Sequence, residues 1–204
     1  MSNPIKYSTG AETLALKSGN FYIGTGDVGK GPTFSTNGGG SIVFDGVDDT
    51  VSTLNNTLFE SECAVSLWFS RDSNNSSQRL IRRVGANVNR FYLLVNSDNI
   101  LVVRGQNISR QAFFSSSIGE WVNVTWQWRI SDTLQQIYIN GNLNYNGDFN
   151  SQVSGGNTTF GLAQAEGVET RFGGNVATAK VYNRILTAQE ILQNYNAQKA
   201  RFGL

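Results

Sequence analysis

The chain contains no histidine, and this absence excludes several kinds of chemistry at once. Serine–histidine–aspartate and cysteine–histidine catalysis, histidine proton transfer and histidine-ligated metals all need an imidazole. Cysteine is nearly absent as well. The single Cys63 leaves neither an intrachain disulfide nor a cysteine-based zinc site. Its neighbours at 64–67, Ala-Val-Ser-Leu, predict a small buried thiol.

Charge is also scarce. Charged residues make up 15% of the 204 residues, against roughly 25% in an average soluble domain. The net charge of +1 offers no electrostatic footprint, so we predict no nucleic-acid and no membrane partner. No stretch approaches the ~18 apolar residues of a membrane span. No apolar run of the length of a secretory signal opens the chain, so we expect any extracellular role to follow another route, such as lysis.

Alternation of apolar and polar residues indicates an all-β chain from about residue 37 onward. The longest alternating run, 121–128, places two valines and two tryptophans on one side. Asn140-Gly141 lies between two apolar runs, which is the strongest short-range signal for a β-hairpin. Turn signals recur at spacings that fit a sandwich or a barrel.

The two ends of the chain depart from this strand pattern. Residues 1–36 are rich in glycine and predict an extended N-terminal arm with short strands. Residues 187–190, Thr-Ala-Gln-Glu, form a capping box and are followed by apolar residues at helical spacing. We therefore predict one short C-terminal helix over about 187–199, closing a domain that spans 37–204. The tail beyond it, with Phe202, would dock onto the sandwich or face a partner.

Five motifs occur in the order found in the laminin-G-like/concanavalin A-like lectin-glucanase superfamily, and the chain resembles that family. They are Phe-Asp-Gly-Val-Asp-Asp at 44–49, Val-Ser-Leu-Trp-Phe at 65–69, Glu-Trp-Val-Asn-Val-Thr at 120–125, Ile-Tyr-Ile-Asn-Gly at 137–141 and the closing motif over 174–191. The resemblance implies two packed antiparallel sheets. The predicted fold class is all-β, a two-sheet antiparallel jelly-roll β-sandwich with one short C-terminal helix.

The chain ends carry a second resemblance. Residues 7–33 and 194–204 are similar to the ends of structural proteins from marine tailed bacteriophages, including cyanophages. This resemblance implies a virion component, either a head decoration or fibre protein or a tail adhesion module. It also implies other virion proteins and copies of itself as partners, and a location on the virion surface, on capsid or tail.

The acidic residues do not form a glycosidase pattern. Glycoside hydrolases on the fold that the chain resembles carry Glu-x-Asp-x-Glu along one strand, which brings the carboxylates onto one face. No such triplet occurs here. The nearest candidates, Glu60 and Glu62, precede a predicted strand, and Glu166 and Glu169 lie in a predicted loop. We therefore predict that the chain is not an enzyme, with a polysaccharide-cleaving enzyme as the least favoured alternative.

Asp45, Asp48 and Asp49 are the candidate metal ligands, because calcium requires clustered oxygen atoms. The resemblance implies two aspartates in the closing motif, but this chain has Ala177 and Thr178 there. A tight turn rich in aspartate explains the three residues equally well. We predict no cofactor and keep structural calcium as the less favoured alternative.

Glycan binding would use aromatic rings that are exposed to stack on sugar faces. Trp128 and Tyr145 are the candidates, although most of the aromatic rings should fill the core. The main prediction is a non-enzymatic virion structural protein that displays a lectin-like sandwich. The alternative is a glycan-binding adhesin that contacts a host surface polysaccharide.

Overall fold

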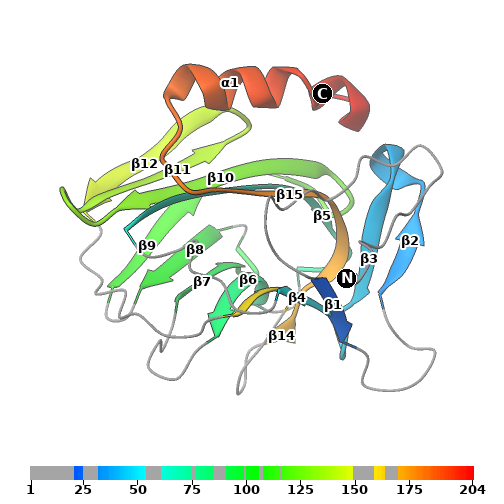
Figure 1. The fold of residues 1–204 in the computed structure, drawn as a ribbon. Coiled ribbons are helices and arrows are strands. Elements are labelled where there is room, and N and C mark those ends of the chain that lie inside the picture. Colours follow the sequence, from blue (N-terminus) through cyan, green and yellow to red (C-terminus); the bar gives the residue numbers. More distant parts are fainter. Residues whose placement is uncertain are drawn as a thin grey trace, which may run out of the picture.

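Two sheets packed face to face form the fold, and a short helical segment lies over one of them (Figure 1). The computed structural model describes residues 21–24, 32–53, 61–74, 77–84, 91–98, 100–105, 108–114, 116–148, 159–163 and 170–204. Pairing between strands is antiparallel throughout these ranges except for one short strand, β14 (Thr170–Arg171). The predicted all-β jelly-roll sandwich is confirmed.

The first sheet has seven strands. Their order is β12 (Asn142–Asp148), β11 (Leu134–Ile139), β10 (Trp121–Arg129), β5 (Glu62–Arg71), β15 (Gly173–Tyr182), β3 (Ser41–Asp45) and β2 (Thr33–Ser35). The central pair is β10 with β5, in which Trp121 lies opposite Ser70 and Arg129 lies opposite Glu62. Strand β12 is therefore one edge of this sheet.

The second sheet contains the remaining strands. Their order is β1 (Phe21–Gly24), β4 (Thr50–Thr53), β13 (Thr159–Leu162), β6 (Gln78–Val84), β7 (Phe91–Val95), β8 (Ile100–Gly105) and β9 (Ile108–Phe113), with β14 beside β6. Strands β1 and β2 fall within the predicted arm, and each sheet takes one of them. The remainder of that arm, 1–20 and 25–31, lies outside the described residues, and the boundary at 36 stays a prediction.

The core lies between the two sheets and follows the alternation of the strands. The residues that β10 contributes to it are Val122, Val124, Trp126 and Trp128. The rings of Trp126 and Trp128 lie 4.7 Å apart, centroid to centroid. Cys63 is buried in the same cluster, as its neighbours predict, and forms no disulfide. Strand periodicity thus determines which side chains fill the sandwich.

The hairpin between β11 and β12 forms at the predicted Asn-Gly pair. Asn140 and Gly141 take φ values of 50° and 79°. Positive φ at both central residues is the geometry whose twist matches that of the flanking strands, and asparagine and glycine tolerate it best. This turn sets the register in which Ile139 faces Asn142.

A C-terminal segment covers the outer face of the seven-stranded sheet, the face that points away from the second sheet (Figure 1). It consists of α1 (Ala188–Asn196) and the 3-10 helix η2 (Lys199–Phe202). The predicted capping box is confirmed, because the Thr187 hydroxyl accepts from the Glu190 amide at 3.2 Å and the Glu190 carboxylate accepts from the Thr187 amide at 2.8 Å. In the described ranges no helix is long and apolar enough to span a membrane.

Helix α1 is shorter than predicted, because the backbone tightens after Asn196 and the amide of Gln198 bonds the carbonyl of Tyr195. This tightening brings Phe202 back onto the sheet. Its ring stacks on Trp68 at 4.1 Å, and Tyr195 stacks on the same indole at 5.5 Å. Phe202 is 8% exposed, whereas Leu204 is 51% exposed. Of the two apolar residues in the tail, Phe202 is the one that docks.

Polar side chains fasten both ends of this C-terminal segment. At its start, the Gln127 amide donates to the Leu186 carbonyl at 3.1 Å and accepts from the Leu186 amide at 2.8 Å. At its end, Arg201 donates to the carbonyls of Gly38 and, at 2.7 Å, Gly40. Gly38 has φ 58°, and a Cβ there would come within 2.6 Å of Trp121. The C-terminus therefore holds the short 3-10 helix η1 (Asn37–Gly39), which leads into β3.

Replacing Phe202 by alanine should lower the free energy of unfolding by about 3 kcal/mol, the ordinary cost of deleting a buried phenylalanine ring. Equilibrium unfolding in urea measures this change. Leu204→Ala is the matched control, because Leu204 is exposed and its loss should cost less than ~0.5 kcal/mol. Equal effects of the two substitutions would contradict the docking of Phe202.

Glu190 gives the helix a dependence on pH. The Arg184 guanidinium, 2.6 Å from the Glu190 carboxylate, and the Thr187 amide lower the pKa of Glu190 from 4.5 to about 2. A lowered pKa contributes stability that is fully present above pH 4.5 and is lost as the pH falls towards about 2. Thermal melts across this window should show a smaller loss for Glu190→Gln than for the native chain. Arg184→Gln should make the loss smaller and complete it at a pH closer to 4.5, and unchanged profiles would contradict this assignment.

Candidate functional site

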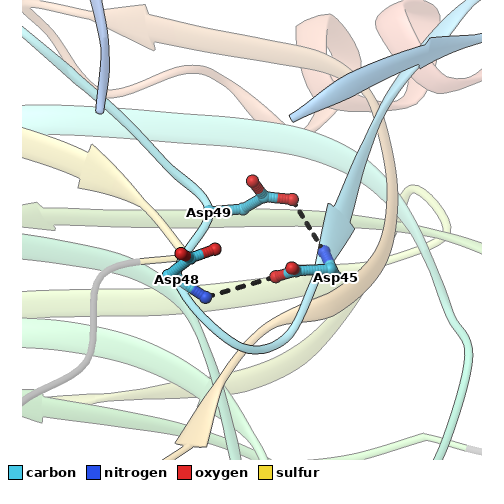
Figure 2. A group of neighbouring side chains, drawn as sticks. All are labelled: Asp45, Asp48 and Asp49. Carbon is cyan, nitrogen blue, oxygen red and sulfur yellow. Dashed lines mark hydrogen bonds between the residues drawn. The ribbon is translucent and has the colours of Figure 1, made fainter. Parts of the chain in front are cut away.

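The turn between β3 and β4 brings three carboxylates together (Figure 2). Asp45, Asp48 and Asp49 each offer one oxygen atom, and these atoms lie within 4.8 Å of one another. Asp45 is exposed, Asp48 is partly buried and Asp49 is buried. Within the described ranges this turn is the one place where three or more potential metal-ligating side chains meet.

Hydrogen bonds within the turn hold two of these side chains. One oxygen of Asp45 accepts from the amides of Val47 at 2.7 Å and Asp48 at 3.3 Å. One oxygen of Asp49 accepts from the Asp45 amide at 2.9 Å. An aspartate that bonds backbone amides two and three residues ahead is a common turn-forming arrangement. The turn therefore has a structural explanation that needs no ion.

The pKa values of the two hydrogen-bonded carboxylates, Asp45 and Asp49, are shifted in opposite directions. Desolvation acts to raise the pKa of Asp45, but the backbone amides of Val47, Asp48 and Asp49 outweigh it and the pKa lies below its ordinary value. For Asp49, desolvation dominates and the nearby charges of Asp45 and Asp48 add to it, so its pKa is raised. Of these two, the buried Asp49 is the one whose negative charge is less well compensated.

A divalent cation fits the residues at this turn. The second oxygen of Asp49, Oδ1, is buried and has no hydrogen-bond partner. A buried acceptor without a partner is costly, and a bound cation would satisfy it. Oxygen atoms up to 4.8 Å apart match ligands about 2.4 Å from a shared calcium ion. Asp45, Asp48 and Asp49 would therefore be the ligands, and calcium there would neutralise the charge that burial disfavours.

The two residues that replace the aspartates of the closing motif have a different place in the fold. Ala177 packs against the cluster of Trp68, Trp121 and Phe202 under the C-terminal segment. Thr178 is buried and lies opposite Trp68 in the sheet. An apolar seat for the C-terminal segment thus occupies positions where the family resemblance implies acids.

The two glycan candidates have different surroundings. Trp128 lies in the core and is 0% exposed, so its ring is not available to stack on a sugar. The alternation that places Trp126 inside the sandwich places Trp128 there too. Tyr145 lies on the edge strand β12, packs against the core and keeps part of its surface exposed. Of the two, Tyr145 has the accessibility that a sugar-binding ring needs.

The candidate catalytic carboxylates do not meet in the described part of the chain. Glu62 begins β5 and lies opposite Arg129 in the sheet, so its nearest strand partner is a cation. Glu60, Glu166 and Glu169 lie outside the described residues. In the described ranges, no second carboxylate lies opposite Glu62 on the neighbouring strand, as a paired acid and base would require.

A sequence profile of the concanavalin A-like lectin/glucanases superfamily matches residues 44–192 of the chain. The match runs from the Phe44 that opens the acidic turn into helix α1. No curated protein sequence matches the chain.

Several solved structures share the fold. Domain 4 of AbnA, a GH43 extracellular arabinanase from Geobacillus stearothermophilus in complex with arabinotriose, superposes with a TM-score of 0.68 at 16% identity, covering 85% of this chain and 87% of that domain. The binding domain of botulinum neurotoxin DC in complex with SialylT gives 0.65 at 15% identity. The binding domain of serotype G gives 0.67 at 14%. The two matches include 88% and 89% of this chain, respectively. The chain spans about half the length of these toxin domains, 47% in both cases.

Calcium should raise the melting temperature of the native chain. At about 100 times a Kd on the order of 10⁻⁴ M, binding to the folded state alone contributes about 2.7 kcal/mol. Differential scanning fluorimetry with calcium and with EDTA measures this shift. Asp49→Asn removes the ligand charge and should abolish the response, whereas Asp98→Asn, in the exposed turn between β7 and β8, should preserve it. If calcium does not change the melting temperature of the native chain, the prediction is wrong and hydrogen bonds alone hold the turn.

Proposed function

Because the chain belongs to the concanavalin A-like lectin/glucanase superfamily, we propose that it is a carbohydrate-binding domain without catalytic activity. The observation that carries this proposal is the agreement of the fold with domains solved in complex with glycans. The arabinanase domain holds arabinotriose, and the toxin domain is in complex with SialylT. Identities of 14–16% make these likenesses of fold, so the ligand of this chain is a matter for direct measurement.

The absence of catalysis in this proposal is supported by how the described acids are used. Glycosidases need two carboxyl groups about 5–10 Å apart on either side of the scissile bond. Glu62 faces Arg129, and Asp132 pairs with the same arginine at 2.5 Å. Asp45 and Asp49 are bound to the amides of their own turn. Asp45, Asp49 and Asp132 thus serve structure, Glu62 lies opposite a cation, and the chain has no histidine to replace them.

The proposed setting is a virion surface, on capsid or tail, because the chain ends resemble structural proteins of tailed bacteriophages. In this setting the partners are other virion proteins and copies of the chain, and the ligand is a host surface polysaccharide. Mass spectrometry of purified particles tests the setting separately from glycan binding. If mass spectrometry does not detect the chain in purified particles, the virion role is overturned and the binding proposal stands.

The purified chain should bind at least one oligosaccharide on an array that carries neutral and acidic glycans, including arabinotriose and sialylated glycans. Incubation of the chain with the polysaccharide of the bound type should release no shorter sugars, measured by chromatography of the supernatant. Absence of binding across the array would overturn the proposed function. Release of oligosaccharides that persists in Glu62→Gln would show catalysis at acids other than Glu62.

A further inference from the structure

Tyr145 lies along its own strand and covers Gly147, two residues further on. A Cβ added to Gly147 would come within 2.3 Å of the Tyr145 hydroxyl oxygen and 2.8 Å of its Cζ. Distances this short exclude every side chain at position 147 while the ring keeps its place. The tyrosine ring therefore rests on bare backbone at the edge of the seven-stranded sheet.

The glycine serves the ring and not the backbone. Gly147 does not have positive φ, unlike Gly141 in the hairpin of the same strand pair. Its conformation is one that any residue adopts in a strand, and glycine weakens a strand interior. The absence of a side chain at Gly147 leaves room for the Tyr145 ring, which offsets the loss of strand stability.

A buried amide lies beside this ring. Gln135 is opposite Gly147 on one side and opposite Trp128 on the other, in register across three strands. The residue as a whole is 2% exposed, and its amide is not among the buried side-chain groups that lack a hydrogen-bond partner. Gln135 thus offers a donor and an acceptor at the base of the ring.

The location leaves Tyr145 accessible at the side of the sandwich. Strand β12 is the edge of its sheet and contacts β9, the edge of the other sheet. Tyr145 packs against the core on one side and is partly exposed on the other. The residues in register around it, Ile137, Gln135 and Gly147, carry no charge.

We propose that Tyr145, seated on Gly147 with the Gln135 amide beside it, is the stacking platform for an uncharged sugar ring. This inference rests on the proposed carbohydrate-binding function and locates its site. The apolar face of a sugar stacks on the tyrosine ring, and a sugar hydroxyl bonds the glutamine amide. Because no charge takes part, the affinity is insensitive to salt, in contrast to recognition of an acidic glycan.

The test uses the neutral oligosaccharide of the array that the native chain binds best, with arabinotriose as the first probe, and isothermal titration calorimetry. Tyr145→Leu keeps apolar packing against the core but removes the flat ring, and should weaken binding about tenfold or more. Tyr145→Phe should retain most of the affinity. Gly147→Ala keeps the tyrosine and displaces its ring, and should weaken binding to a similar extent. Near-ultraviolet circular dichroism of the core tryptophans verifies that each variant is folded.

Leu143→Ala is the matched control, because Leu143 lies on the same strand, is exposed, and faces the opposite side with Tyr138. It should leave binding unchanged. If the native chain binds a glycan and Tyr145→Leu and Gly147→Ala bind it equally well, the platform is overturned and the carbohydrate-binding function stands. If the native chain binds acidic glycans alone, with affinity that falls steeply with salt, the uncharged class is overturned. If it binds no glycan, both proposals fail.

Discussion

The stacking of Phe202 and Tyr195 on Trp68 decides which parts of the protein surface remain open to a ligand. It closes the outer face of the seven-stranded sheet with residues from the end of the chain. The polar side chains on that face are then satisfied internally, since Asn123 donates to the Leu67 carbonyl at 3.1 Å and Thr125 donates to Ser66 at 2.9 Å. A sheet face closed in this way offers a ligand neither rings nor free amides. A glycan bound as proposed must therefore lie elsewhere on the sandwich.

This arrangement also accounts for which of the two family motifs carries acidic residues in this chain. In the closing motif, Ala177 gives the C-terminal segment a small apolar seat, and a carboxylate at this partly buried position would lose hydration beside the indole rings. The acids of the opening motif remain at the far end of β3, away from that seat. Their charge is concentrated on one turn, and burial of Asp49 makes a cation the natural complement to it. A cation held at this turn would thus be separated in space from the docked tail.

Much of the fold could be predicted from the sequence, because alternation and turn chemistry are local. The side chains of β10, the Asn140 hairpin and the Thr187 cap all follow from neighbours a few residues apart. Trp128 shows the limit of choosing sites from residue type, since the alternation that buries Trp126 also buries Trp128. Docking of Phe202 on Trp68 joins residues far apart in the chain, and no local pattern specifies it. The seat of Tyr145 on Gly147 is local in sequence, but it depends on the direction of a side chain that periodicity does not give.

The edge platform also bears on how strongly such a domain can bind. Tyr145 is held by the core and by Gly147, so little side-chain entropy remains to be lost when a sugar stacks on it. A single ring and one amide nevertheless cover a small area, and interactions of that size correspond to weak affinity for an individual sugar. Weak sites become effective when many copies engage a repeating polymer, because each further contact is intramolecular. A carbohydrate-binding domain of this design therefore suits display in many copies, which is the arrangement that a virion surface would provide.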